Sequence, residues 1–293
     1  MSTYKTEGII IKRNNFLESG LILNIYTRDY GKIEAVARSA RKAKGKLKGH
    51  LELFLWTEII LAHGKNIDTI TSSLTIKSFS SLRNNLKLSF AAYYILELVD
   101  KITAEEYQDE RIFYLLKRSL LFLDELAICV VETRHCLVST TIILLFQINI
   151  LDLTGFSPEL NNCVFCEKPI KPDKNYFSFS MGGVVGKECI LQKSSKSLVG
   201  RYEPSFTSET SASEGLHLPN VLISDNAIKL LRLLQFKGNN TEEYNEHLDK
   251  CFKIIRKLKT NQKLVSDSVF LMNKFIEFNI ERKIKGFDFL ENM

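Results

Sequence analysis

Residues 21–37 decide the fold class of this chain, and their sequence is LILNIYTRDYGKIEAVA. Leu21–Thr27 is rich in β-forming residues, and Lys32–Ala37 alternates polar and apolar residues with the period of two that is typical of a strand. The short turn Asp29-Tyr30-Gly31 joins them. The stretch therefore predicts two consecutive antiparallel strands in a sheet that has one buried face.

Three further segments within residues 1–80 are predicted to be strands: Tyr4–Lys12, Leu51–Ala62 and Ile67–Ile76. Five strands joined largely by hairpins over so short a length are typical of a small closed barrel such as the OB-fold. An SH3-like barrel would give much the same pattern, so periodicity alone does not distinguish the two folds.

The hydrophobic period changes to that of a helix from Leu82 onward. One stripe carries Leu86, Phe90, Tyr93, Tyr94, Leu98 and Val99. Further helices are predicted over Glu105–Asp124 and Leu126–Leu153, and the second is apolar nearly all round. We therefore place that helix at the centre of a bundle. Gly155 and Pro158 end it.

Three amphipathic helices are predicted near the C-terminus, over Asn226–Phe236, Glu242–Leu258 and Leu264–Ile280. The expected N-cap of the first helix is Ser224 or Asp225, and that of the second is Thr241. The segment before these helices is irregular. It includes a Ser-rich stretch from Ser194 to Ser213, which has too few apolar residues to form a buried core.

The fold class predicted from these segments is α+β, with a five-stranded OB-fold barrel followed by an α-helical bundle that carries an irregular, zinc-finger-like insertion. The expected domains are residues 1–80 as an OB-fold nucleic-acid-binding domain, 81–158 as a helical domain, 159–220 as a Cys-containing insertion with a Ser-rich loop, and 221–293 as C-terminal helices packing on the helical domain.

Positive charge is concentrated at the start of the chain. The net charge of +6 comes from 40 basic and 34 acidic residues. Residues 1–80 hold 13 Lys and Arg against 7 Asp and Glu, whereas the remaining residues hold 27 of each. A local excess of this kind is a plausible footprint for phosphate binding, and a solvated surface that promotes solubility is the alternative.

The surplus is densest between the third and fourth predicted strands. Six cations lie within eleven residues that contain no acidic residue: Arg38, Arg41, Lys42, Lys44, Lys46 and Lys48. On a barrel surface they would contact a nucleic-acid backbone, and nothing in the segment is arranged to distinguish bases. The sequence therefore predicts sequence-independent binding. A solvated charged loop is the alternative.

Aromatic side chains are the second requirement for holding single strands, because bases stack on exposed rings. Tyr30, beside the turn glycine, is the best candidate for such a ring. Phe54 and Trp56 are expected to share one face of a strand and to point together into the core.

Cys163-Val-Phe-Cys166, followed after 22 residues by Cys189, could hold a metal ion. A structural zinc site needs four ligands, and the position three after Cys189 is Gln192, a poor zinc ligand. His217 or Cys251 could complete the set, although neither has the usual spacing. The alternative is a decayed site whose thiols are packed or reduced. Cys129 and Cys136, in apolar sequence, are expected to be buried thiols.

Signatures of an enzyme are absent from the sequence. The run Gly182-Gly-Val-Val-Gly186-Lys187 has the wrong spacing for a phosphate-binding loop, and Glu188 stands where that loop needs Ser or Thr. No HExxH or GxSxG motif is present. We therefore expect no catalytic residues. The most apolar stretch, Leu137–Leu153, is too polar for a membrane span, and no secretory signal is visible, so a cytoplasmic location is expected.

The ordered set of motifs resembles RecO, a family of bacterial recombination mediators. The similarity starts with Thr6-Glu7-Gly8-Ile9-Ile10, Glu18-Ser19-Gly20-Leu21-Ile22-Leu23, Thr27-Arg28-Asp29-Tyr30-Gly31-Lys32 and Leu51-Glu52-Leu53-Phe54. It continues through Leu153-Thr154-Gly155-Phe156-Ser157-Pro158, Cys163-Val-Phe-Cys166, Phe177-Ser-Phe-Ser and Gly182-Gly183 ahead of Cys189. The specificity of the resemblance comes from the consistent order of these motifs along the chain.

The resemblance implies an N-terminal OB-fold, a helical bundle and a zinc-binding insertion. It also implies binding to single- and double-stranded DNA, strand annealing, and a mediator role in the RecF pathway of repair and recombination, close to the nucleoid. Implied partners are RecR and the C-terminal tail of the single-strand-binding protein. Gln192 stands where the family's four-Cys pattern has its last Cys, so the resemblance supplies three of the four expected zinc ligands.

Two other functions are open at this level. In the first, the basic barrel docks an acidic protein partner and DNA contact is incidental. In the second, the chain is a nucleic-acid-modifying enzyme, which would require a carboxylate or His/Cys cluster that the sequence does not display.

Overall fold

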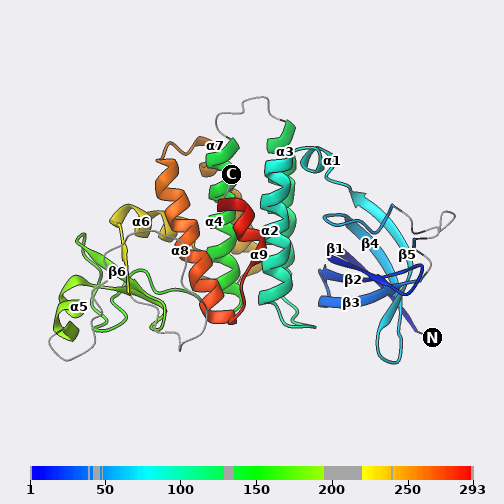
Figure 1. The fold of residues 1–293 in the computed structure, drawn as a ribbon, viewed down its shortest axis with the longest axis horizontal. Helices are drawn as coiled ribbons and strands as arrows, with labels where there is room; N and C mark the ends of the chain where they lie inside the picture. Colours follow the sequence, from blue (N-terminus) through cyan, green and yellow to red (C-terminus); the bar gives the residue numbers. More distant parts are fainter. Residues whose placement is uncertain are drawn as a thin grey trace.

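The computed structural model describes residues 2–38, 40–41, 47, 49–128, 135–194, 220–238 and 240–291. Figure 1 shows a small barrel at one end of the molecule, a group of helices in the centre, and a second small sheet with one helix at the other end. The helical body therefore separates the two regions that carry the candidate sites.

The barrel contains five strands: β1 (Thr3–Phe16), β2 (Gly20–Thr27), β3 (Gly31–Ala37), β4 (Trp56–Ala62) and β5 (Asp68–Lys77). Their order is β1-β2-β3-β5-β4, closed by antiparallel pairing of β4 with β1. Parallel pairing of β3 with β5 is limited to Ala35↔Asp68 and Val36↔Thr69. This strand order is that of the OB-fold, so the predicted fold class is confirmed.

The predicted hairpin forms in the expected register, with Leu21 opposite Ala37 and Thr27 opposite Gly31. Its alternate side chains, including Leu23, Ile25 and Ala35, are fully buried in the core of the barrel. Burial of one face of each strand is what fixes this register, because a slip by one residue would expose every one of these side chains.

The helical body follows the barrel. It contains α1 (Ser80–Arg83), α2 (Leu86–Ile102), α3 (Glu110–Ile128), α4 (His135–Leu153), α6 (Asp225–Leu234), α7 (Thr241–Lys257), α8 (Gln262–Ile280) and α9 (Lys285–Glu291). Side-chain caps begin four of them: Asn85, Ser224, Asn240 and Asn261 each accept a hydrogen bond from a backbone N–H of the first turn. Ser224 was among the predicted caps, whereas Asn240, rather than Thr241, caps α7.

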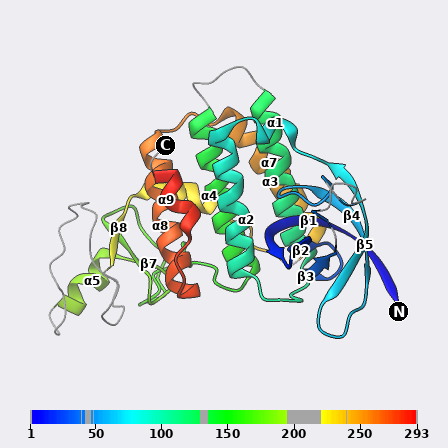
Figure 2. The ribbon, with the colours of Figure 1, turned by 45° about the vertical axis from the view of Figure 1, so that its right-hand side comes forward.

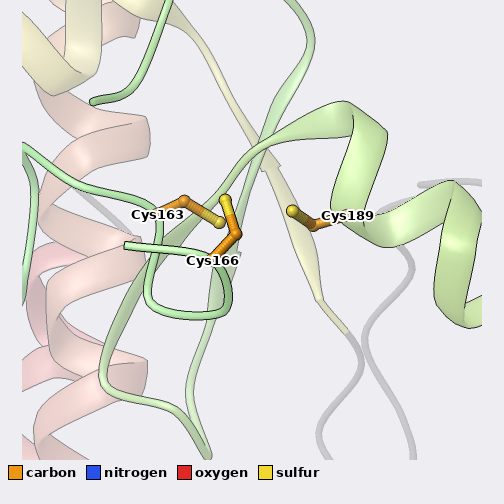
Figure 3. Close-up of side chains that lie close together, drawn as sticks. All are labelled: Cys163, Cys166 and Cys189. Carbon is orange, nitrogen blue, oxygen red and sulfur yellow. The ribbon is translucent and has the colours of Figure 1, made fainter. Parts of the chain in front are cut away.

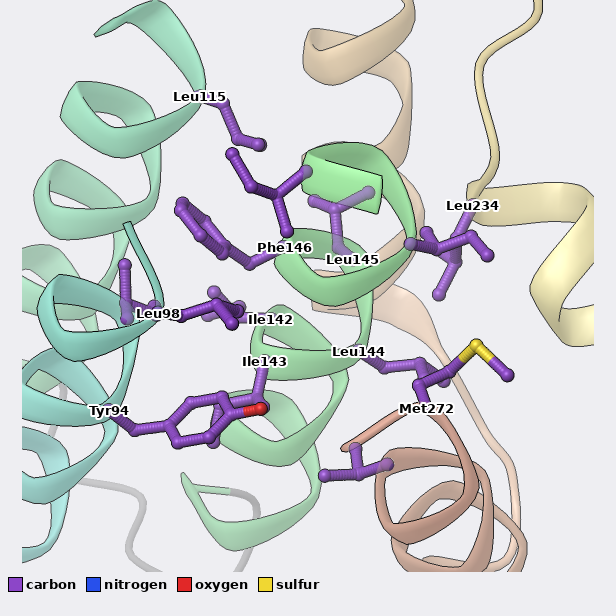
Figure 4. Packing of buried hydrophobic residues seen from close by; sticks show 14 of the residues in the cluster. Tyr94, Leu98, Leu115, Ile142, Ile143, Leu144, Leu145, Phe146, Leu234 and Met272 are labelled. Carbon is purple, nitrogen blue, oxygen red and sulfur yellow. The ribbon is translucent and has the colours of Figure 1, made fainter. Parts of the chain in front are cut away.

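Helix α4 lies at the centre of the body, as its apolar sequence predicts. Figure 4 shows Ile142, Ile143 and Phe146 of this helix packed among side chains of the surrounding helices, with Tyr94 and Met272 on either side. The expectation that this stretch is too polar to span a membrane is wrong by composition: an 18-residue window of α4, Cys136–Leu153, is long and apolar enough, but 72% of it is buried inside the protein. Packing within the bundle accounts for that apolar character.

The barrel lies beside the helical body (Figure 2), and hydrogen bonds from its side chains fix its position. The Asp100 carboxylate accepts hydrogen bonds from Lys12 Nζ at 2.8 Å and from Asn24 Nδ2 at 2.9 Å. Lys32 of β3 donates to the backbone carbonyls of Asp100 at 2.7 Å and Thr103 at 2.5 Å. These carbonyls lie at the C-terminal end of α2, where a cation is favoured. Burial nevertheless lowers the pKa of Lys32.

The second sheet has the order β7-β6-β8, from β6 (Asn175–Ser178), β7 (Gly183–Val185) and β8 (Val221–Ile223). Helix α5 (Lys187–Ser194) follows β7. Gly183 admits no side chain, because a Cβ there would lie 2.4 Å from the carbonyl oxygen of Glu159. The close approach allows Val184 N–H to donate to that oxygen at 2.8 Å and draws the segment before Cys163 against β7.

Two predictions about single side chains are wrong. Phe54 and Trp56 do not point together into the core, because β4 begins only at Trp56 and Phe54 has a left-handed φ of 69°. Phe54 is buried, whereas Trp56 is half-buried, with Lys117 Nζ 4.0 Å from its ring centroid. Cys136 is exposed rather than buried. Cys129 lies outside the described residues.

Candidate nucleic-acid interface and metal centre

The segment that carries the six predicted cations, residues 38–48, directly follows β3, and we call it the cationic segment. Arg38 and Arg41 are both exposed, whereas Lys42, Lys44, Lys46 and Lys48 lie outside the described residues. Neither arginine forms an ion pair with a carboxylate of the described residues, whereas Arg13 of β1 pairs with Glu52. The two guanidinium groups are therefore available to an anion from solution.

The tip of the β1–β2 hairpin lies beside this segment. The backbone N–H of Arg41 donates to the carbonyl oxygen of Ser19 at 3.0 Å. The pairing of Leu21 with Ala37 places the start of β2 next to the end of β3. The hairpin tip, residues 17–19, and the two arginines thus form one end of the barrel, which we call the cationic end.

Tyr30 does not belong to the cationic end. It lies in the turn before β3, and seven residues at about 3.3 Å each put roughly 20 Å between the two ends of that strand. Tyr30 is 43% exposed, and its ring centroid lies 4.7 Å from that of Tyr4 in an edge-on arrangement. Tyr4 in turn stacks on His63, with ring centroids 4.7 Å apart. Sequence reasoning missed Tyr4 and His63, because only the pairing of β1 with β4 brings them to Tyr30.

Three cysteines converge at the far end of the molecule. The Sγ atoms of Cys163, Cys166 and Cys189 all lie within 4.8 Å of one another (Figure 3). Cys163 and Cys166 come from a turn closed by Glu167 N–H donating to the Cys163 carbonyl at 2.8 Å, and Cys189 comes from the first turn of α5. Sulfurs on one tetrahedral zinc ion are about 3.8 Å apart. Sulfurs that lie within 4.8 Å of one another are therefore close enough to share one ion.

The surroundings of Cys163 favour its thiolate. Burial alone would raise the pKa of Cys163, but backbone N–H groups of Gly186, Cys166 and Phe165 donate to the sulfur and bring the pKa down to about 7. The Gly186 N–H lies 3.4 Å from Sγ. For Cys189, burial and the two neighbouring sulfurs raise the pKa to about 12. A cation between the sulfurs would stabilise all three as thiolates.

The described residues supply no fourth ligand to this cluster. Cys251 is excluded, because its Sγ lies 3.3 Å from His247 Nε2 and 3.8 Å from the Leu233 carbonyl, inside the helical body. Gln192 belongs to α5, one turn beyond Cys189. His217 lies outside the described residues. The arrangement can therefore bind a metal ion through three sulfurs, with the fourth position taken by another group.

Comparisons with known proteins agree with this architecture. A family model described as Recombination protein O N terminal matches residues 1–79, and one described as Recombination protein O C terminal matches residues 83–256. The DNA repair protein RecO of Dehalococcoides mccartyi is 31% identical over 290 residues, which cover 99% of this chain and 96% of that protein.

Two further relatives carry the same name. The DNA repair protein RecO of Syntrophus aciditrophicus is 31% identical over 191 residues, 64% of this chain and 70% of its own. That of a Roseiflexus species is 34% identical over 186 residues, 64% of this chain and 62% of its own. With both family models matched along most of its length, the chain belongs to the recombination protein O family of DNA repair proteins.

Proposed function

We propose that this protein binds DNA without regard to sequence and anneals complementary strands, as a recombination mediator of the RecF pathway. The observation that carries the proposal is the cationic end of the barrel, where Arg38 and Arg41 are exposed and have no carboxylate partner among the described residues. Cations of this kind hold phosphates and leave base edges free to pair. No covalent step is needed, so we propose no catalytic residue.

The proposed DNA-binding residues are Arg38, Arg41, Lys42, Lys44, Lys46 and Lys48, with Tyr30 as a separate stacking ring at the other end of β3. Single- and double-stranded DNA are the proposed ligands. RecR and the C-terminal tail of the single-strand-binding protein are the proposed protein partners, and the cytoplasm, close to the nucleoid, is the proposed location. The domain boundaries proposed from the sequence, after residues 80, 158 and 220, are part of the same hypothesis.

Binding and annealing can be measured with the full chain. The affinity for a labelled single strand is expected to fall linearly with salt on a double-logarithmic plot, by about 0.7 log unit per decade for each phosphate contact. Complementary strands mixed with the protein should anneal faster than free strands. Weak binding with no dependence on salt, or annealing at the uncatalysed rate, would contradict the proposal.

The alternative is a module that docks an acidic protein through the same cations. An acidic peptide titrated against the labelled strand separates the two functions. If DNA is the ligand, the peptide competes weakly and the strand stays bound at low salt. If the peptide binds tightly under conditions where the strand does not, the cationic end serves a protein partner instead.

We also propose that the three-cysteine cluster binds zinc, because cysteine sulfurs close enough to share one ion are typical ligands of structural zinc. Protein purified without chelator is expected to contain about one zinc per chain by mass spectrometry of the metal. The double variant Cys163→Ser, Cys166→Ser should lose it, whereas Cys136→Ser, which removes an exposed thiol of α4, should retain it.

A fourth thiolate provides the stricter test of this site. Gln192→Cys restores the four-Cys sequence pattern, with its last Cys three residues after Cys189, and is expected to slow the loss of zinc to a chelator. Zinc-free protein that keeps its melting temperature, together with a Gln192→Cys variant that is also zinc-free, would argue that the cluster is a set of reduced thiols.

A further inference from the structure

The tip of the β1–β2 hairpin presents an apolar side chain to solvent. Leu17 is 81% exposed, more than any other large hydrophobic residue among those the structure describes. It has a left-handed φ of 50°, in the three-residue turn between Phe16 and Gly20. Both properties are unfavourable for leucine, since exposure forgoes burial of its side chain and a Cβ is disfavoured in left-handed backbone.

Neither property is required by the hairpin. Glycine occupies left-handed backbone without steric cost, and asparagine tolerates it better than leucine does. A polar residue would also suit an exposed tip. The fold would therefore be at least as stable with another residue at this position, which points to a contact outside the chain as the reason for leucine.

The position of the tip indicates what that contact is. Ser19, two residues after Leu17, accepts the hydrogen bond from Arg41 N–H, so the tip lies at the cationic end. Arg38 and Arg41 suit phosphates, whereas Leu17 and the exposed carboxylate of Glu18 do not. A polynucleotide held by the arginines would bring its bases, rather than its backbone, to the leucine.

We propose that Leu17 is a base-contacting residue, which packs against an unstacked base of a single strand held at the cationic end. The inference rests on the proposed DNA binding and adds a contact that phosphate binding alone does not need. Apolar side chains are known to pack against or between bases, and the favourable contact area is apolar and therefore insensitive to salt.

The test compares Leu17→Gly, Leu17→Asn and Leu17→Met in the full chain. Leu17→Gly is expected to raise the melting temperature by about 2–4 °C, because the left-handed strain is removed. The same variant should bind a labelled single strand on the order of fivefold more weakly, with an unchanged salt slope. Leu17→Asn should lose affinity likewise, and Leu17→Met should keep it. The matched control is Leu222→Asn, which changes an exposed leucine of β8, in the small sheet at the other end of the molecule (Figure 2), and should bind as the parent does.

An oligonucleotide of abasic residues distinguishes the base contact from the phosphate contacts. The parent and Leu17→Gly should bind this strand equally, because only the base contact is missing from it. Equal affinity of the two proteins for a normal strand would overturn the inference while leaving the proposed DNA binding intact. A lower melting temperature of Leu17→Gly, with weaker binding to both strands, would show that Leu17 is structural. Failure of the parent protein to bind any strand would instead reject the proposed function.

Discussion

Replacing Lys42, Lys44 and Lys46 together by glutamine is expected to weaken binding to single-stranded DNA by about 100-fold at 0.1 M salt. Each phosphate contact contributes about 0.7 to the slope of log affinity against log salt for a single strand, so three lost contacts remove about 2.1 from the slope. Because 0.1 M lies one decade of salt concentration below 1 M, a slope smaller by 2.1 lowers the affinity at 0.1 M by roughly two powers of ten, or about 3 kcal/mol. Fluorescence anisotropy over a salt series measures both quantities.

A control with the same change in net charge comes from α7. Lys250, Lys253 and Lys257 are exposed on this helix of the body, and their replacement by glutamine also lowers the net charge by three. If only the charge of the whole protein mattered, the two triple variants would bind alike. We expect the α7 variant to keep nearly the parent affinity and slope. Arg38→Gln with Arg41→Gln should reduce the slope by about 1.4. If neither this double variant nor the Lys42, Lys44 and Lys46 triple variant changed the affinity or the slope, the electrostatic basis of the proposed function would be lost.

The strands of the barrel could be predicted from the sequence because the pattern that specifies each strand and turn lies within a short segment. The alternation in residues 21–37 fixes which side chains face the core, and the pairing of Leu21 with Ala37 follows from the short turn. Closure of the barrel is different, because the parallel contact of β3 with β5 joins residues more than thirty positions apart through two residue pairs. Periodicity within a strand carries no signal of such a contact.

The errors have equally local causes. A period of two predicts a shared face only inside a strand, and the left-handed backbone of Phe54 ends that rule before Trp56 begins β4. Cys136 lies in the first turn of α4, where apolar sequence continues past the part of the helix that its neighbours cover. Composition shows that a helix is central, and it does not show where along its length the burial stops.

Part of each candidate site could likewise be predicted from local sequence, and part depends on the fold. The spacing of Cys163 and Cys166 predicts that they share a metal ion, and the position of Cys189 beside them depends on the fold of β6, β7 and α5. Charge density identifies the cationic segment and the turn glycine marks Tyr30 as an exposed ring, but neither signal shows that they lie at opposite ends of β3. A strand carries residues that are close in sequence to opposite ends of a barrel.

Gly31→Ala is expected to lower the free energy of unfolding by about 2–5 kcal/mol. Gly31 has a φ of 65°, and an alanine Cβ there would lie 2.2 Å from the backbone oxygen of Tyr107, in the connection between α2 and α3. Left-handed backbone costs a residue with a Cβ about 1–2 kcal/mol, and forcing a methyl group into close-packed surroundings costs a further 1–3 kcal/mol. The atoms in the way are backbone, so a change of rotamer cannot relieve the clash.

Gly155→Ala separates the two contributions. Gly155 has a φ of 84°, and a Cβ there would meet nothing within 4 Å, so this variant bears the backbone cost alone. Urea unfolding of both variants should therefore show Gly31→Ala to be less stable than Gly155→Ala by about 1–3 kcal/mol. Because the turn of Gly31 contacts the connection after α2, the extra loss would measure how tightly the barrel packs on the helical body. Equal losses would mean that the barrel yields at this contact without cost, and that its position relative to α2 is held by Asp100 and Lys32 instead.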